Sequence, residues 1–91
     1  MASHIKDFSE SDKEESQDIN NGLLLPTFVD VFFDKKLLSF NEKGESILSE
    51  SLKYLLREKE ISYLEKIVIN KEYLTKGRLK YLEWHRNKLI K

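Results

Sequence analysis

The sequence predicts a small α+β domain, and three observations lead to this fold class. Two short apolar runs, at residues 37–40 and 46–48, flank an Asn-Glu-Lys-Gly segment, which is typical of a β-hairpin closed by a turn. Residues 28–34 are almost continuously apolar, and residues 79–90 place apolar side chains near helical spacing. The chain has 91 residues, of which 40% are hydrophobic and 35% charged, and this is the composition of one ordered domain.

The composition also excludes several kinds of site. No cysteine is present, which removes disulfides, zinc sites built from thiolates and cysteine nucleophiles. No apolar run approaches the roughly 18 residues of a membrane span, so we expect no membrane partner. The first residues lack the charged and then apolar segments of an export signal. We therefore expect a cytoplasmic protein.

The first part of the chain is predicted to contain a loop, a strand and a helix. Residues 6–20 are polar and acidic with no apolar period, which is typical of a surface loop. Residues 23–25 form an apolar run that Pro26 stops, which is consistent with a buried strand. Thr27 is suited to cap a helix over residues 28–34, and this helix is so apolar that we expect most of it to be buried.

Helices are predicted to follow the hairpin. Ser49 or Ser51 is suited to cap a helix that ends near Glu58, and Thr75 is suited to cap a final helix. Residues 61–69 are compatible with either a helix or a strand. We see no internal repeat.

Charge is unevenly distributed, although 16 basic residues balance 16 acidic ones. Residues 1–20 carry two lysines against six acidic residues, whereas residues 71–91 carry seven Lys and Arg against two acidic residues. A basic segment gains affinity for phosphate by releasing condensed counterions. Amphipathic helices are often basic without such a partner, so charge alone leaves both interpretations open.

Two carboxylates share one face of the apolar helix predicted at residues 28–34. Asp30 and Asp34 are four residues apart, so in a helix they lie one above the other and repel. They therefore require solvent, a basic partner or a metal ion. Oxygen ligands without thiolates suit Mg²⁺ or Mn²⁺. The alternative is a solvent-facing stripe, or an ion pair with Lys35, Lys36 or Arg78.

Several short stretches are informative because of their order along the chain. They are Ser3-His4-Ile5-Lys6, Asn21-Gly22-Leu23-Leu24-Leu25, Asp30-Val31-Phe32-Phe33-Asp34, Leu38-Ser39-Phe40 and Tyr81-Leu82-Glu83-Trp84-His85-Arg86. In this order they resemble the HNH endonucleases, the ββα-metal nucleases, in their restriction-endonuclease-like branch. The resemblance extends over essentially the whole chain and rests on the combination, since each stretch alone is a weak signal.

The resemblance implies an HNH-like ββα-metal core, followed by a β-hairpin and C-terminal helices. Because the chain begins at Met1, we expect this core to lack its first strand and the chain to be part of a larger protein, with the upstream region as a partner. Residues 1–91 then form a single domain, with the HNH-like core and hairpin in residues 1–48 and a helical part in residues 49–91.

The resemblance also implies a role for individual residues. His4 would act as the general base that takes a proton from the attacking water, and Asn21 would brace the loop that holds it. Asp30 and Asp34 would bind one divalent metal ion, Mg²⁺ or Mn²⁺. The residues expected to contact DNA are Lys6, Arg78 and Arg86.

The function implied is metal-dependent hydrolysis of DNA phosphodiester bonds by an HNH-type endonuclease. Ser3 stands where the family often has a further metal ligand, and Asp30 stands at the last signature histidine. The alternatives are a non-catalytic interaction domain that retains a truncated HNH scaffold, and a helical regulatory module. Without the strand that would hold His4 in place, we expect little activity from the chain alone. For His85, a packing or capping role is favoured.

Overall fold

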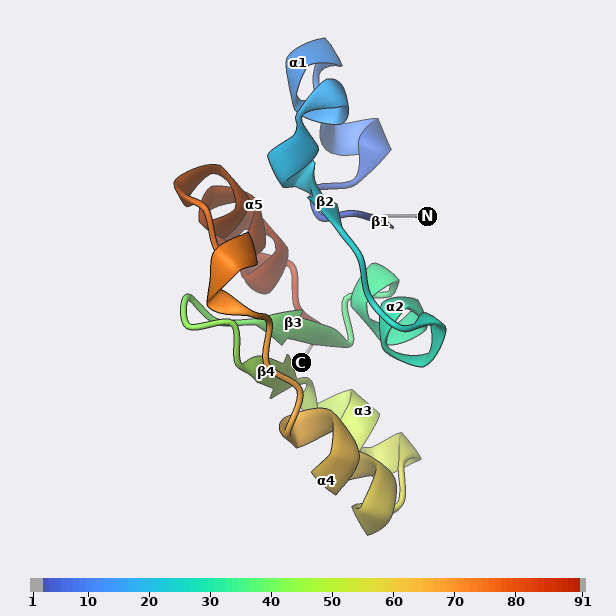
Figure 1. The fold of residues 1–91 in the computed structure, drawn as a ribbon. Coiled ribbons are helices and arrows are strands. Elements are labelled where there is room, and N and C mark those ends of the chain that lie inside the picture. Colours follow the sequence, from blue (N-terminus) through green and yellow to red (C-terminus); the bar gives the residue numbers. More distant parts are fainter. Residues whose placement is uncertain (1–2, 91) are drawn as a thin grey trace.

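Two short antiparallel sheets and five α-helices make up residues 3–90, the part of the chain that the computed structural model describes (Figure 1). The predicted α+β class is confirmed. In chain order the elements are β1 (Ser3–His4), η1 (Phe8–Glu10), α1 (Lys13–Gln17), η2 (Ile19–Asn21), β2 (Gly22–Leu23), α2 (Thr27–Asp34), β3 (Leu38–Phe40), β4 (Ser46–Leu48), α3 (Glu50–Leu55), α4 (Glu58–Glu65), η3 (Lys71–Tyr73) and α5 (Lys76–Asn87), where η marks a 3₁₀ turn.

The first sheet joins β1 to β2. His4 lies opposite Gly22 in an antiparallel register, and the N–H of Ile5 continues the pairing by donating to the carbonyl of Asn21 at 2.8 Å. A two-residue strand that contains His4 therefore precedes β2 and pairs with it. The second strand is shorter than the apolar run suggested, and Leu24, beyond its end, is 75% exposed.

The second sheet is the predicted hairpin of β3 and β4. Its register pairs Leu38 with Leu48. Gly44 closes the turn with a φ of 81°, a conformation that favours glycine, and a Cβ atom there would lie 2.8 Å from the carbonyl oxygen of Ile69. The Asn41 side chain accepts hydrogen bonds from the N–H groups of residues 43 and 45, so local turn chemistry fixes the hairpin.

The predicted caps of two helices are confirmed. The Ser49 hydroxyl accepts from the N–H of Leu52 at the start of α3, and the Thr75 hydroxyl accepts from the N–H of Arg78 at the start of α5. The ambiguous segment 61–69 divides in two. Helix α4 ends at Glu65, and residues 67–69 then run extended beside the hairpin turn, where Val68 bridges to residue 45.

Two local predictions are wrong. Residues 6–20 are not a plain loop, because Asp12 and Glu15 form a reciprocal capping box that starts helix α1. Thr27 is the first residue of α2 rather than its cap, and Pro26 takes the cap position with its φ of −55°. A further correction concerns the burial of α2, since Phe28 on this helix is 47% exposed.

The core lies between α2, the β3–β4 hairpin and α5, with α3 and α4 on the far side of β4 (Figure 1). Phe33 of α2 and Phe40 of β3 are fully buried, and their ring centroids are 5.8 Å apart. Helix α5 packs against both β3 and η2. Its contact with η2 brings the C-terminal helix next to the N-terminal part of the described chain. No helix within residues 3–90 is long and apolar enough to cross a membrane.

Candidate functional site

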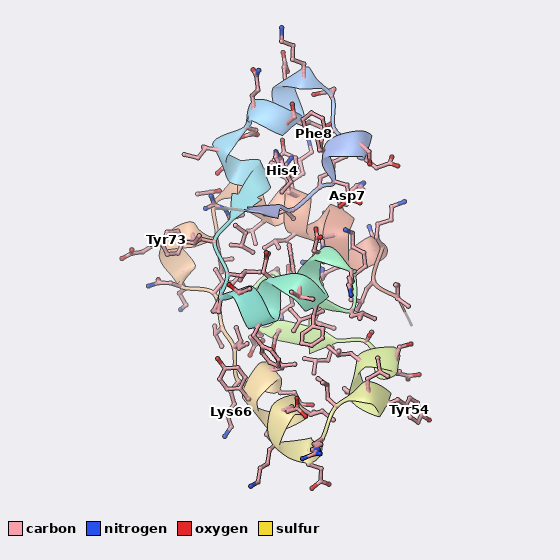
Figure 2. All side chains as sticks on the ribbon, turned by 90° about the vertical axis from the view of Figure 1, so that its right-hand side faces the viewer. His4, Asp7, Phe8, Tyr54, Lys66 and Tyr73 are labelled. Atoms are coloured by element: carbon pink, nitrogen blue, oxygen red, sulfur yellow. The ribbon has the colours of Figure 1, made fainter. Side chains whose placement is uncertain are left out.

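His4 lies at the end of β1, exposed and close to the acidic segment that follows it. Its Nε2 atom is 3.0 Å from the carbonyl oxygen of Ser16, and its ring meets Phe8 edge-on with centroids 6.0 Å apart. Figure 2 shows His4 beside Asp7 and Phe8. Because a carbonyl only accepts hydrogen bonds, Nε2 carries the hydrogen, and Nδ1 of the neutral ring keeps its lone pair.

Asn21 ties the loop after His4 to β2. The side chain is fully buried, and its Oδ1 accepts from the N–H of Lys6 at 2.7 Å. Its Nδ2 donates to the carbonyl of Glu15 at 2.9 Å and reaches the Ser11 hydroxyl at 3.4 Å. A neutral amide is suited to this position because it donates and accepts at once without titrating. The buried Asn21 side chain therefore braces the loop after His4 from inside.

The two aspartates lie on α2, one turn apart. Asp30 is half-buried in the first turn, and Asp34 is exposed at the last residue of the helix. Within the described residues no three His, Cys, Asp or Glu side chains gather closely enough to hold a metal ion, so His4 does not join the aspartates in such a group. Mg²⁺ is often bound by one or two carboxylates with water completing its shell, and the aspartate pair fits that donor set.

The two arginines predicted to contact DNA have structural partners. Arg78 donates from three different nitrogens to the carbonyls of Ile19, Gly22 and Tyr73, at 3.1, 3.0 and 2.8 Å. Arg86 donates to the carbonyl of Phe40 at 2.9 Å. These bonds give both guanidinium groups a structural role, because they tie α5 to η2, β2 and β3.

The first turns of α5 bind η2, a contact that the sequence did not reveal. The Thr75 hydroxyl donates to Oδ1 of Asn20 at 2.7 Å, and the Tyr81 hydroxyl donates to Asp18 at 2.9 Å. Burial, together with the Asp18 carboxylate, raises the pKa of Tyr81 to about 12. Hydrogen bonds from the Asn20 N–H and from Tyr81 hold the pKa of Asp18 below its usual value. Helix α5 thus fixes the segment that carries Asn21.

His85 is a fully buried polar link between three elements. Its Nε2 donates to the carbonyl of Phe33 at the end of α2, so Nδ1 accepts from the Ser39 hydroxyl of β3, each at 2.7 Å. The imidazole also stacks on the Phe33 ring with centroids 3.8 Å apart. Burial lowers the pKa of His85 to about 4, and the neutral ring is therefore the state that packs in the core.

An apolar groove of about 510 Å³ lies between the end of β2 and residues 67–70. Leu24 and Pro26 line one side, Val68 the other, and Ile19 and Tyr73 lie at its edge. Leu24 is 75% exposed, and Val68 is also exposed. The groove adjoins the carbonyls that Arg78 binds, and it is separate from the loop that holds His4.

No protein-family model matches this chain, and no curated protein matches it with significance. The resemblance to HNH endonucleases therefore rests on the sequence stretches quoted above. The residues expected to form the site lie on separate elements, with His4 on β1, Asn21 on η2 and the aspartate pair on α2.

Proposed function

We propose that this chain is a metal-dependent endonuclease domain of the HNH type that hydrolyses DNA phosphodiester bonds. The observation that supports this most directly is the buried Asn21, which accepts from the N–H of Lys6 and so braces the loop after His4. The chain order β1, η2, β2, α2 supports it as well, because His4 lies on β1, Asn21 directly before β2, and the aspartates on α2. In this proposal His4 is the general base, and Asn21 is a positioning residue.

The proton transfer is assigned to Nδ1 of His4. A water attacks the phosphorus, its proton passes to Nδ1, and the bond from phosphorus to the leaving oxygen breaks. The leaving oxygen then takes up a proton from solvent water. The Nε2–H bond to the Ser16 carbonyl orients the ring, and it also stabilises the imidazolium that forms, because that donor is more acidic in the charged ring. The exposed position of His4 leaves the ring accessible to a large substrate such as DNA.

Asp30 and Asp34 are assigned to the divalent cation. One helical turn separates them, so both carboxylates can bind one ion. Bound Mg²⁺ or Mn²⁺ stabilises the negative charge that develops on the phosphate oxygens. The two carboxylates repel each other without a cation, so binding one also relieves this repulsion.

Plasmid nicking with Mg²⁺ or Mn²⁺, and with EDTA as the metal-free arm, tests the proposal. Replacing His4 by Ala should lower the rate by about 10²–10⁴-fold. The variant Asp30→Asn with Asp34→Asn should be inactive at metal concentrations that saturate the wild type. A matched control, Glu58→Gln with Glu65→Gln, changes two exposed carboxylates of α4 and should cleave normally. Cleavage that persists in EDTA, or full activity of His4→Ala, would contradict the assignment.

The second candidate function is a non-catalytic interaction domain on the same scaffold. The apolar groove favours it, because exposed Leu24 and Val68 on its two sides are suited to a protein contact. If the wild-type chain nicks no plasmid with either Mg²⁺ or Mn²⁺, this candidate is favoured over the nuclease. Leu24→Ser should then abolish partner binding while the chain still folds.

A further inference from the structure

Trp84 of α5 is surrounded by three lysines. The ammonium nitrogens of Lys6, Lys36 and Lys88 lie 5.9, 5.9 and 5.7 Å from the centroid of its ring. They come from separate parts of the chain, namely the loop after β1, the turn after α2 and the end of α5. Each distance is within the range of a cation–π contact, so one indole ring gathers three positive charges.

The charges at this ring are only partly compensated. Lys36 donates to Asp7 at 2.7 Å, and Lys6 pairs with Glu15 at 2.9 Å. Lys88 forms no ion pair within residues 3–90. Three ammonium groups against two carboxylates leave one positive charge in excess. The lysine cluster on Trp84 is therefore able to bind an additional anion. The carboxylates of Asp7 and Glu15 position two of the lysines in the absence of that anion.

Lys36 lies directly after the C-terminal end of helix α2. Its φ is 63°, in the left-handed region that residues other than glycine and asparagine rarely adopt. The turn is fixed by two hydrogen bonds, from the N–H of Lys36 to the carbonyl of Phe33 and from the N–H of Leu37 to the carbonyl of Phe32. These are the two bonds of a Schellman motif, so the left-handed residue ends α2 and turns the chain toward β3. This helix end fixes the place from which the Lys36 side chain reaches Trp84.

We propose that Lys6, Lys36 and Lys88, gathered on Trp84, bind phosphates of the DNA backbone beside His4. This inference rests on the function proposed above and names the surface that would hold its substrate. Lysine acts on phosphate as a point charge, and such contacts position DNA without reading its sequence. Because ammonium groups already contact the indole, the ring holds the lysines rather than stacking on a base. We therefore expect binding that is independent of base sequence.

The loop that Asn21 braces connects this surface to the proposed base. Lys6 lies two residues after His4, so at most about 7 Å of chain separates their Cα atoms. The Asn21 side chain holds the N–H of Lys6, and the Asn21 carbonyl holds that of Ile5. A phosphate bound at Lys6 would therefore be held by the loop that directly follows His4.

The single tryptophan of the chain makes this site observable. A DNA duplex of about 20 base pairs, titrated in EDTA so that it stays uncleaved, should change the fluorescence of Trp84 as it binds. Lys36→Gln and Lys88→Gln should each weaken binding several-fold and reduce the slope of log affinity against log salt by about 0.9. Lys66→Gln is the matched control, because Lys66 is exposed and lies at the opposite end of the molecule from His4 (Figure 2).

The outcomes for this site and for the nuclease are separate. An unchanged Trp84 signal, or wild-type affinity and salt slope in both lysine variants, overturns the DNA site even if the chain cleaves plasmid. Normal binding at Trp84 without cleavage under either metal supports the site and contradicts the nuclease. A fluorescence change of equal size with vesicles containing 30% phosphatidylserine would overturn the assignment to DNA. Lys88 is exposed, so Lys88→Gln tests the site even if Lys36→Gln disturbs the turn.

Discussion

His85 and Ser39 join helix α5 to strand β3 through a 2.7 Å hydrogen bond inside the core. The residues are 46 positions apart, and both side chains are fully buried. The other ring nitrogen of His85 binds the carbonyl of Phe33, so the imidazole satisfies a donor and an acceptor at once. A buried polar link of this kind fixes one arrangement of three elements and becomes costly when either partner is lost.

Stability should fall in mild acid because of His85. Its pKa is about 4 in the folded chain and near 6.5 when unfolded, so the unfolded state binds more protons between these values. Stability is therefore complete above pH 6.5 and decreases as the pH falls toward 4, by about 3 kcal/mol in all. Urea unfolding at intervals from pH 7.5 to 4.5 measures this loss. A flat profile above pH 5 would contradict the assignment to His85.

Replacing Ser39 by Ala should destabilise the fold by about 1–3 kcal/mol. The substitution removes the donor to Nδ1 of His85 and leaves a buried acceptor without a partner. Chemical denaturation of the variant measures the loss. Ser62→Ala, at an exposed position in α4, is the control and should change stability by no more than about 0.5 kcal/mol. Equal stability of the two variants would show that the Ser39 hydroxyl contributes nothing.

Replacing Asn21 by Ala should loosen the loop after His4. The Lys6 N–H and the Glu15 carbonyl both lose their partner in a buried region, which costs about 2–4 kcal/mol together. Amide hydrogen exchange should accelerate most at residues 5–16, and any nuclease activity should fall with it. Asn87→Ala, at the exposed end of α5, is the matched control. Loss of protection spread evenly over all elements would argue against a local brace.

Mn²⁺ should bind weakly at the aspartate pair. In an NMR titration, paramagnetic broadening should appear first at Asp30 and Asp34, with His4 affected next. The double variant Asp30→Asn with Asp34→Asn should lose this broadening. If the signals of residues 7–18 broaden alone, the ion is attracted only by the acidic segment, and the metal assignment to α2 fails.

The elements predicted correctly from the sequence are those that are determined by residues close together in the chain. The Asn-Glu-Lys-Gly turn determines the hairpin, and the caps Ser49 and Thr75 determine where α3 and α5 begin. A few neighbouring residues were therefore enough to predict these elements. The α1 helix also had a local signal, since Asp12 and Glu15 have the spacing of a capping box.

The candidate site was less predictable because its contacts are long-range. Nothing near Arg78 in sequence indicates that its guanidinium bonds to carbonyls at Ile19 and Gly22, more than 50 residues away. The same holds for the lysines around Trp84, which come from three segments. Composition indicated a basic end of the chain but did not distinguish arginines with carbonyl partners from lysines that gather on one ring.

The bonds from Arg78 to the carbonyls of Ile19 and Gly22 have a consequence for synthesis of the protein. They close loops of 59 and 56 residues, and the Tyr81 bond to Asp18 closes one of 63. Contacts of such long separation form late, because the chain between them must be ordered first. The segment before β2 therefore lacks its bonds to α5 while only the first 70 residues have left the ribosome. In a nascent chain, the link between η2 and α5 should therefore form only after residues 75–81 have emerged.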